Sequence, residues 1–327
     1  MMMIDEHLLI LVLALLLDRI VGDPDWLWTR LPHPVVLFGK AISFVDTRFN
    51  LKRLSAADRR RNGLVSILAL LALSAVVGVL LHNVLSLFGW LGLIAEALLV
   101  AIFLAQKSLA DHVIAVSTAL RREGLEGGRR AVSRIVGRDP EALDEPAVCR
   151  AAIESLAENF SDGVVAPALW YAVFGLPGLL LYKMLNTADS MIGHKTETYI
   201  DFGRASALLD DVANWPAARL SILLIALGAM ARRGAAALNN ALRIAARDGG
   251  LHRSPNSGRP EAAMAGALDI QLAGPRIYAG EMVREPMING AGRGTATVSD
   301  VEVGVTIFNA ACTVLAIATL AGFLLFL

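Results

Sequence analysis

The sequence has little charge, little cysteine and no net charge, and each shortage excludes a class of protein. Charged residues fill 18% of the 327 positions, below the share of about 25% in soluble domains. Because 30 basic side chains balance 30 acidic ones, the chain lacks the strongly basic character of nucleic-acid-binding proteins. Cys149 and Cys312 are the only cysteines, and they lie too far apart for a metal motif or a disulfide framework. We therefore expect free or buried thiols, a small-molecule substrate and no nucleic-acid partner.

Hydrophobic residues, by contrast, fill 55% of the sequence, and the mean hydropathy is +0.56. The apolar runs are spread along the whole chain, which indicates one membrane-embedded domain over residues 1–327. The first run, residues 4–21, has no basic residues before it and no cleavage site after it, so we expect a membrane helix and not a signal peptide. The expected fold is all-α: a polytopic helix bundle in the cytoplasmic (inner) membrane, surrounded by the lipid bilayer.

Basic residues predict how this bundle is oriented. They concentrate in residues 40–61, 106–149 and 232–233, which the positive-inside rule places in cytoplasmic loops. Residues 64–104 are too long for one span of about 20 residues, and His82-Asn83 marks the expected break between two helices.

Residues 164–231 then cross the membrane twice or not at all. One apolar run in this region contains Pro177 and the other begins after Pro216. Both would fit re-entrant or broken helices around a site at membrane depth.

Polar residues gather between Glu154 and Trp215 as nowhere else in the chain. In E-S-L-A-E-N-F-S-D-G, the carboxylates of Glu154, Glu158 and Asp162 fall at i, i+4 and i+8, which stacks them along one helix face. A Mg²⁺ ion would offset their repulsion, since it takes one or two carboxylates together with substrate phosphates. The alternative is a solvated acidic helix face.

A second polar segment follows. Lys183, Asn186 and Ser190 share one helix face, with Asp189 beside them, and Asp210-Asp211 come next. A Lys or Asp at the centre of a bilayer costs about 2.5–3.5 kcal/mol. These side chains therefore must line a watery cavity or lie outside the hydrocarbon, and we treat them as functional candidates.

The chain has no G-x-x-x-x-G-K-[ST] phosphate loop, so a nucleotide site would have to be of another type. Residues 254–258 are of types that favour a turn, and Pro260 suits the first turn of the Ala-rich helix that follows. The start of that helix, beside Arg253 and Arg259, would form an anion pocket. The alternative is an ordinary capped helix.

Two other polar residues are open to two interpretations. His33 follows a turn rich in Pro and Gly and is either functional or a lone loop histidine. Glu96 lies inside an apolar run, where it either serves a function, snorkels or pairs with a neighbour.

Five ordered motifs resemble the CobD/CbiB family, the adenosylcobinamide-phosphate synthases of cobalamin biosynthesis. They are D-x-x-x-G-D-P from Asp18 with His33-Pro34-Val35, E-S-x-A-E-N-x-S-D-G from Glu154, N-T-x-D-S-M-x-G from Asn186, D-D-x-A-N-W-P-A-A-R from Asp210, and H-x-S-P-N-S-G with A-A-M-A-G-A-L from His252. The resemblance implies an ATP- and Mg²⁺-dependent ligase. It would join adenosylcobyric acid, a corrinoid, to aminopropanol or aminopropanol phosphate and give adenosylcobinamide or its phosphate.

This chemistry suggests a role for each candidate. Metal binding would fall to Glu154, Glu158, Asp162, Asp210 and Asp211, with Asp189 as an alternative member of the second set. Phosphate would be faced by Lys183, Arg253 and Arg259, and ATP would also contact Asn186, Ser190, Asn256 and Ser257. Lys183, Asp189, His33 and His252 would be catalytic, and His194 is a further candidate for moving a proton.

Two features of the resemblance stay open. The chain departs from the family after Gly193, where basic residues expected near Thr198 and Ile200 are missing. Aromatic side chains could contact the flat corrin or equally sit at membrane interfaces; they are Trp170, Tyr171, Tyr182, Tyr199, Trp215 and Tyr278.

Three other functions compete with ligation. Facing acidic clusters would also serve an intramembrane transferase with a Mg²⁺-diphosphate substrate. A transporter could line its pathway with Glu96 and the central charges. A non-catalytic membrane sensor is the third alternative, but the intact acidic and Ser-Pro-Asn motifs argue against it, because a sensor does not need a complete set of metal- and phosphate-binding residues. Other membrane enzymes of the cobalamin pathway are candidate partners.

Overall fold

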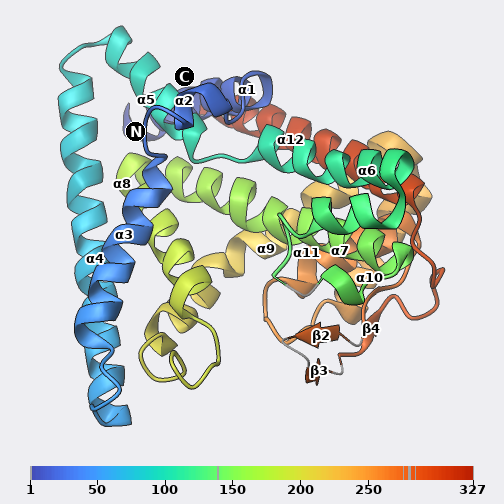
Figure 1. Cartoon of the computed structure of the whole chain (residues 1–327). Coiled ribbons are helices and arrows are strands. Elements are labelled where there is room, and N and C mark those ends of the chain that lie inside the picture. Colours follow the sequence, from blue (N-terminus) through green and yellow to red (C-terminus); the bar gives the residue numbers. More distant parts are fainter. Residues whose placement is uncertain (1, 138–139, 275, 279–280, 284, 327) are drawn as a thin grey trace. The chain divides into compact units, whose positions relative to one another are not determined.

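The computed structural model describes residues 2–137, 140–274, 276–278, 281–283 and 285–326. Helices make up most of this part of the chain (Figure 1). The chain folds into two compact units. Unit 1 comprises Met1–Leu104, Ala166–Asn214 and Leu320–Leu327, and unit 2 comprises Ala105–Val165 and Trp215–Thr319.

Unit 1 is built from apolar helices that pack through a small core. The core joins Ile42, Ile67, Leu185 and Phe202 with their neighbours. The helices are α1 (Met2–Ile20), α2 (Asp25–Trp28), α3 (Pro34–Phe49), α4 (Ala56–Ser86), α5 (Trp90–Ile102), α8 (Ala166–Ile192) and the start of α9 (Arg204–Arg233).

Unit 2 contains the rest of α9 and most of α12 (Val298–Phe326). Its other helices are α6 (Gln106–Val132), the 3₁₀ turn η1 (Pro140–Ala142), α7 (Glu145–Phe160), the π-helical turn η2 (Ser161–Val165), α10 (Ala235–Asp248) and α11 (Gly258–Leu268). Four short strands form two antiparallel pairs, β1 (Leu272–Ala273) with β4 (Met287–Ile288) and β2 (Arg276–Tyr278) with β3 (Glu281–Val283). The segment 274–297 thus contains the short strands β2, β3 and β4.

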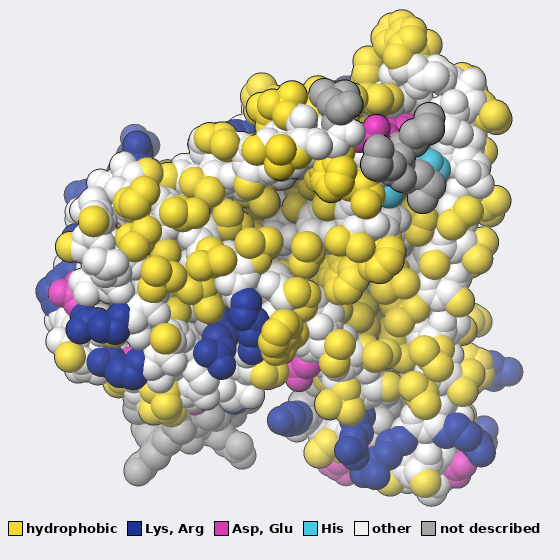
Figure 2. All heavy atoms as spheres, turned by 180° about the vertical axis from the view of Figure 1, so that it is seen from behind, with side chains coloured by type: hydrophobic (Ala, Val, Ile, Leu, Met, Phe, Trp, Pro, Cys, Tyr) yellow, Lys and Arg dark blue, Asp and Glu magenta, His cyan; other side chains and the backbone are white. Residues whose placement is uncertain are grey.

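The membrane character of the chain is confirmed. In the described part of the chain, five helical stretches are long and apolar enough to cross a membrane, so this is a multi-pass membrane protein. Helix α4 shows why: large apolar side chains such as Leu68, Val76 and Leu80 are exposed along it, as their exposed fractions show. Figure 2 shows hydrophobic side chains over much of the face that it presents. Helix α1 is not among the five, because four charged residues interrupt it.

The predicted break at His82-Asn83 is wrong. Helix α4 continues to Ser86, and the turn comes at Gly89, which takes φ 55°, a left-handed conformation that costs glycine little. The prediction of broken helices is confirmed at Gly175, whose φ of 63° interrupts α8 just before Pro177. A Cβ at Gly175 would lie 2.5 Å from His7 Nε2, so the break also lets α8 approach α1.

Helices α10 and α11 pack closely at Gly266. A Cβ there would lie 2.4 Å from the Asn240 carbonyl oxygen. We therefore expect Gly266→Ala to lower the free energy of unfolding by about 1–3 kcal/mol, the usual cost of overpacking, measured as a lower Tm in detergent. Gly137→Ala is the matched control, since no atom of the described residues lies within 4 Å of its Cβ position. An equal loss in both variants would contradict this packing role.

Asp248 at the end of α10 holds the segment around β4. Its carboxylate accepts hydrogen bonds from Arg247 Nε at 2.6 Å and from the Asn289 backbone N–H at 2.7 Å. These bonds, the Arg247 bond most of all, lower the pKa of Asp248 in the folded protein. Its stabilisation is thus complete above the unfolded pKa of about 3.9 and is lost as the pH falls through the folded pKa.

We expect Asp248→Asn to lower Tm at pH 7, with the gap to wild type closing as the pH falls below about 4. Thermal unfolding in detergent between pH 3 and pH 8 measures this. A gap that stays constant across the range would contradict a role for the charge.

Candidate functional site

The candidate site in unit 2 begins at the turn that leads into α11. His252 Nδ1 accepts the Ser254 backbone N–H at 3.0 Å, and Ser254 Oγ accepts the backbone N–H groups of Asn256 and Ser257 at 3.3 and 3.2 Å. The turn is thus fixed by its own side chains. The Ser257 side chain does not cap α11. The Arg259 N–H donates to the Asn256 carbonyl oxygen at 3.0 Å and the Glu261 N–H to the Ser257 carbonyl oxygen at 3.3 Å, and Pro260 has no N–H. The predicted helix start is confirmed.

Two neighbouring helices are joined to this turn by hydrogen bonds. Ser257 Oγ donates to Glu158 Oε1 at 2.8 Å, from α7. Arg219 Nη1, from α9, donates to Asn256 Oδ1 at 2.9 Å, and its guanidinium lies 4.5 Å from the centre of the Trp215 ring. Arg219 was not assigned a function from the sequence, although it is the last residue of the D-D-x-A-N-W-P-A-A-R motif.

Arg259 is the cation best suited to an anion here. It is half-buried in the first turn of α11, and among the described residues its Nε has no hydrogen-bond partner. A buried guanidinium N–H without a partner is costly, and an anionic ligand would supply one. Arg253 is more exposed and lies 3.7 Å from Glu285. Two of the three predicted phosphate contacts, Arg253 and Arg259, thus flank this turn, and Arg259 is the stronger of the two. The third, Lys183, lies on α8 in unit 1.

The acidic face of α7 does not act as one group. Glu154 is buried, and its Oε1 accepts the Ala273 backbone N–H at 2.7 Å, which ties α7 to β1. Glu158 is half-buried and faces Ser257, and Asp162 lies in the π-helical turn η2. Within the described ranges, no three His, Cys, Asp or Glu side chains gather closely enough to hold a metal ion. Since Mg²⁺ can take one or two carboxylates together with phosphates, metal binding stays a prediction.

Unit 1 holds a second polar cluster, centred on Asp210. Asp210 is buried, and its two oxygens accept hydrogen bonds from Asn214 Nδ2 at 2.8 Å and Asn186 Nδ2 at 3.5 Å. Tyr182 completes the network, since its hydroxyl donates to Asn214 Oδ1 at 2.8 Å. This network brings together Asn186 and Asp210, two of the residues predicted for the site.

The other candidates on α8 and α9 lie along the same helices. Lys183, Asp189 and Asp211 are half-buried. The Ser190 hydroxyl donates to the Asn186 carbonyl oxygen at 2.9 Å, one turn earlier in α8. Ser190 thus donates within its own helix.

Two arginines of α4 contact the loop 193–203 near the positions where basic residues are missing. Arg60 Nε lies 2.7 Å from Asp201 Oδ1, and Arg59 donates to the Thr198 carbonyl oxygen. His194 is exposed in this loop. The arginines of residues 40–61 are therefore partly structural, which their position in the sequence did not indicate.

His33 and His252 are held in the same way. The Nδ1 atom of His33 accepts the Val35 backbone N–H at 3.2 Å, as His252 Nδ1 accepts that of Ser254. An Nδ1 that accepts leaves the proton of the neutral ring on Nε2. For His33, Nε2 lies 3.7 Å from Asp23 Oδ1. His33 is thus the N-cap of α3 as well as a candidate for proton transfer.

Buried aromatic side chains correct one expectation. Tyr171 and Tyr182 are buried in unit 1, so neither can contact a corrin from this position. The Tyr171 hydroxyl donates to Glu96 Oε1 at 2.7 Å, and His82 Nδ1 lies 2.9 Å from Glu96 Oε2. For Glu96, pairing with a neighbour is confirmed.

The chain matches the CobD/Cbib protein family over residues 11–308. It is 68% identical over 314 residues to the cobalamin biosynthesis protein CobD of Sinorhizobium sp, which covers 96% of this chain and 97% of that protein. The CobD protein of Rhizobium meliloti (strain 1021) is 66% identical over 313 residues, with 96% of each chain covered. That of Brucella anthropi is 56% identical over 301 residues, with 92% of each covered. No solved structure matches this chain significantly.

The matched region contains all five motifs and both polar clusters. Similarity at this level over nearly the whole of each relative excludes a match through apolar composition alone. The chain therefore belongs to the CobD/CbiB family and acts in cobalamin biosynthesis.

Proposed function

We propose that this protein is an acid–amine ligase, the adenosylcobinamide-phosphate synthase of its pathway. It joins the propionate carboxyl group of adenosylcobyric acid to aminopropanol or aminopropanol phosphate. In the first step a carboxylate oxygen attacks the γ-phosphorus of ATP, which forms an acyl phosphate and releases ADP. In the second the amine attacks the acyl carbon, phosphate leaves with the electron pair of the C–O bond, and the amine nitrogen loses a proton.

What supports this function most directly in the structure is the turn before α11. The dipole of α11 and the Arg259 guanidinium both favour phosphate oxygens. In phosphoryl transfer, catalysis consists mainly of positioning and of stabilising charge on the transferred group. Asn256 and Ser257 hold the turn in place, and Arg219 fixes Asn256.

Glu158 is the carboxylate best suited to hold Mg²⁺. It is half-buried, it lies beside the phosphate-binding turn, and hard cations bind such oxygens. Asp162, four residues further, is the second ligand that we assign. Glu154 instead positions α7 against β1. Bound Mg²⁺ would neutralise charge on the phosphates.

In the polar cluster of unit 1, some residues orient their neighbours and others are assigned to binding the substrate. Asp210 orients Asn186 and Asn214. We assign Lys183, Asp189 and Asp211 to substrate binding, because half-buried charges in an apolar helix bundle are functional candidates. His33 and His252 carry a proton on Nε2 when neutral, and we assign them to proton transfer.

Substitution of Glu158 tests its assigned role. We expect Glu158→Gln to lower kcat for the ATP-dependent ligation at least 10²-fold, because the neutral amide keeps the contact with Ser257 but loses the charge. The corrinoid product is followed by mass and ADP release is followed in parallel. Glu145→Gln, at the exposed start of the same helix, is the matched control. Unchanged ligation in folded Glu158→Gln protein would remove Glu158 from the mechanism.

Substitution of Arg259 tests phosphate binding at α11. We expect Arg259→Gln to raise the KM for ATP about tenfold or more, since a charge-assisted hydrogen bond to phosphate is lost, with little change in Tm. Arg243→Gln, which removes an exposed arginine on α10, should leave KM unchanged. If Arg259→Gln lowered Tm sharply while the surviving protein kept its KM, the residue would be structural.

A further inference from the structure

Helix α6 folds back on itself at Gly124. This residue takes φ 67° and ψ −158°, which ends one helical limb at residue 123 and begins another. Gly124 is the residue that divides this helix. Gly127 and Gly128 instead let the limbs meet, because a Cβ at Gly128 would lie 2.2 Å from Leu120 Cδ2 and one at Gly127 would lie 2.4 Å from Glu123 Cβ.

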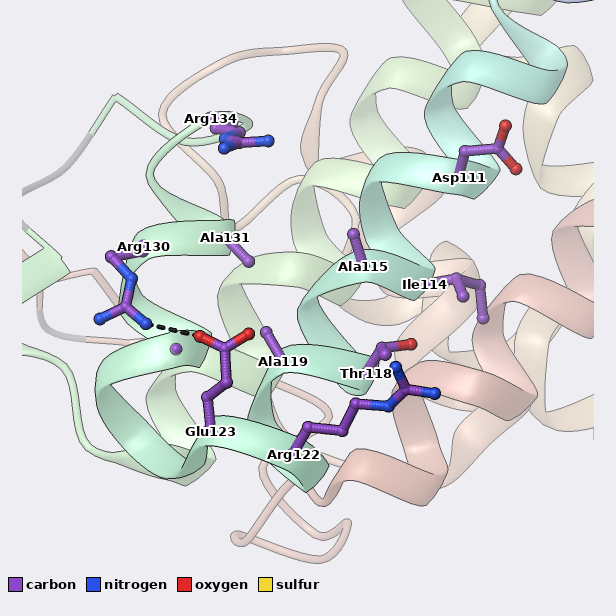
Figure 3. Close-up of a pocket in the computed structure, with 11 residues that line it drawn as sticks. Asp111, Ile114, Ala115, Thr118, Ala119, Arg122, Glu123, Arg130, Ala131 and Arg134 are labelled. Atoms are coloured by element: carbon purple, nitrogen blue, oxygen red, sulfur yellow. Dashed lines mark hydrogen bonds and ion pairs between the residues drawn. The ribbon is translucent and has the colours of Figure 1, made fainter.

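A groove runs between the two limbs, and we call it the α6 groove (Figure 3). Its volume is about 540 Å³, within the range of about 300–1,000 Å³ of small-molecule sites. Its floor is apolar and formed mainly of small side chains, namely Ile114, Ala115, Ala119 and Ala131. Such a floor leaves room for a thin apolar chain to lie close to the helix backbone.

Three arginines rim the α6 groove. Arg130 is paired, with its Nη2 2.6 Å from Glu123 Oε2. Arg122 and Arg134 are exposed, and the structure shows no acidic partner for either among the residues that it describes. Figure 3 shows these two at opposite ends of the groove, with the alanines between them. The other acid of the lining, Asp111, is paired with Lys107 at 2.5 Å.

The lining favours one occupant, an anionic phospholipid. Its phosphate would meet Arg122 or Arg134, because guanidinium groups bind phosphate oxygens through paired N–H donors. Its acyl chain would cover the alanine floor. A nucleotide or a corrin fits less well, since the lining residues include no aromatic side chain on which a flat ring could stack. A free phosphate would leave the apolar floor exposed to water.

We infer that the α6 groove is a binding site for one anionic phospholipid, separate from the turn at α11. Both features lie in unit 2, but they share no lining residue. Basic pockets between helices are a known mode of anionic lipid recognition. Here the kink at Gly124 builds the pocket, and the unpaired arginines make it selective for negative headgroups.

The test is lipid retention by the full-length protein. Purified protein is exchanged into mixed micelles with equal phosphatidylcholine and phosphatidylglycerol, and the lipid that stays bound is identified by native mass spectrometry. We expect roughly tenfold or greater enrichment of phosphatidylglycerol. Arg122→Gln with Arg134→Gln should remove most of it. Ala115→Leu, which fills the floor and leaves the charges intact, should also lower retention.

The matched control is Lys52→Gln with Arg53→Gln, which removes the same charge from exposed positions in residues 40–61. It should keep the enrichment of wild type. The inference is overturned if the Arg122 and Arg134 double variant retains phosphatidylglycerol like wild type, or if the control loses as much. It is also overturned if glycerol phosphate displaces the lipid at equal concentration, which would indicate a free-phosphate site.

Discussion

Ionisable groups in so apolar a chain need partners, and this constraint explains most of the polar structure. A charge left alone in an apolar environment costs several kcal/mol, and one that is paired or hydrogen-bonded is tolerated. The Glu154 carboxylate accepts a hydrogen bond from a backbone N–H, and the Asp210 carboxylate accepts hydrogen bonds from two side-chain amides. Glu96 pairs with Tyr171 and His82. The bonds from Glu154 to Ala273 and from Tyr171 to Glu96 also join elements far apart in the sequence, so these polar contacts help to hold the helices together.

Departures from this rule mark where a ligand would bind. Arg259 Nε is buried beside a helix start with no hydrogen-bond partner in the described structure. At the surface, Arg122 and Arg134 face an apolar floor and lack acidic partners among the described residues. Both features are guanidinium groups and both suit phosphate oxygens, but the first adjoins a carboxylate that could hold a cation and the second adjoins a surface suited to an acyl chain. One therefore fits a reaction centre and the other a lipid.

The sequence predicts the fold class well, because helix length and hydropathy are local properties. It also finds the turn at Ser254–Gly258, since Ser, Pro, Asn and Gly in that order specify a turn. It misses what depends on tertiary contacts. Glu154 and Glu158 share a helix face, but only the fold decides that one binds backbone and the other a serine hydroxyl. In the sequence, Arg59 and Arg60 indicate only a cytoplasmic loop, but in the structure they bind the loop 193–203. Tyr171 and Tyr182 look like interface aromatics and are core.

The most direct measurement follows the oxygens of the reacting carboxylate. Adenosylcobyric acid labelled with ¹⁸O in its free carboxyl group is incubated with the purified protein, ATP, Mg²⁺ and aminopropanol phosphate. The account predicts one ¹⁸O atom in inorganic phosphate for each amide formed, because the acyl phosphate loses its bridging oxygen with the phosphoryl group. Amide formation that leaves ¹⁸O out of phosphate, or no amide from folded protein with any amino alcohol, would contradict it.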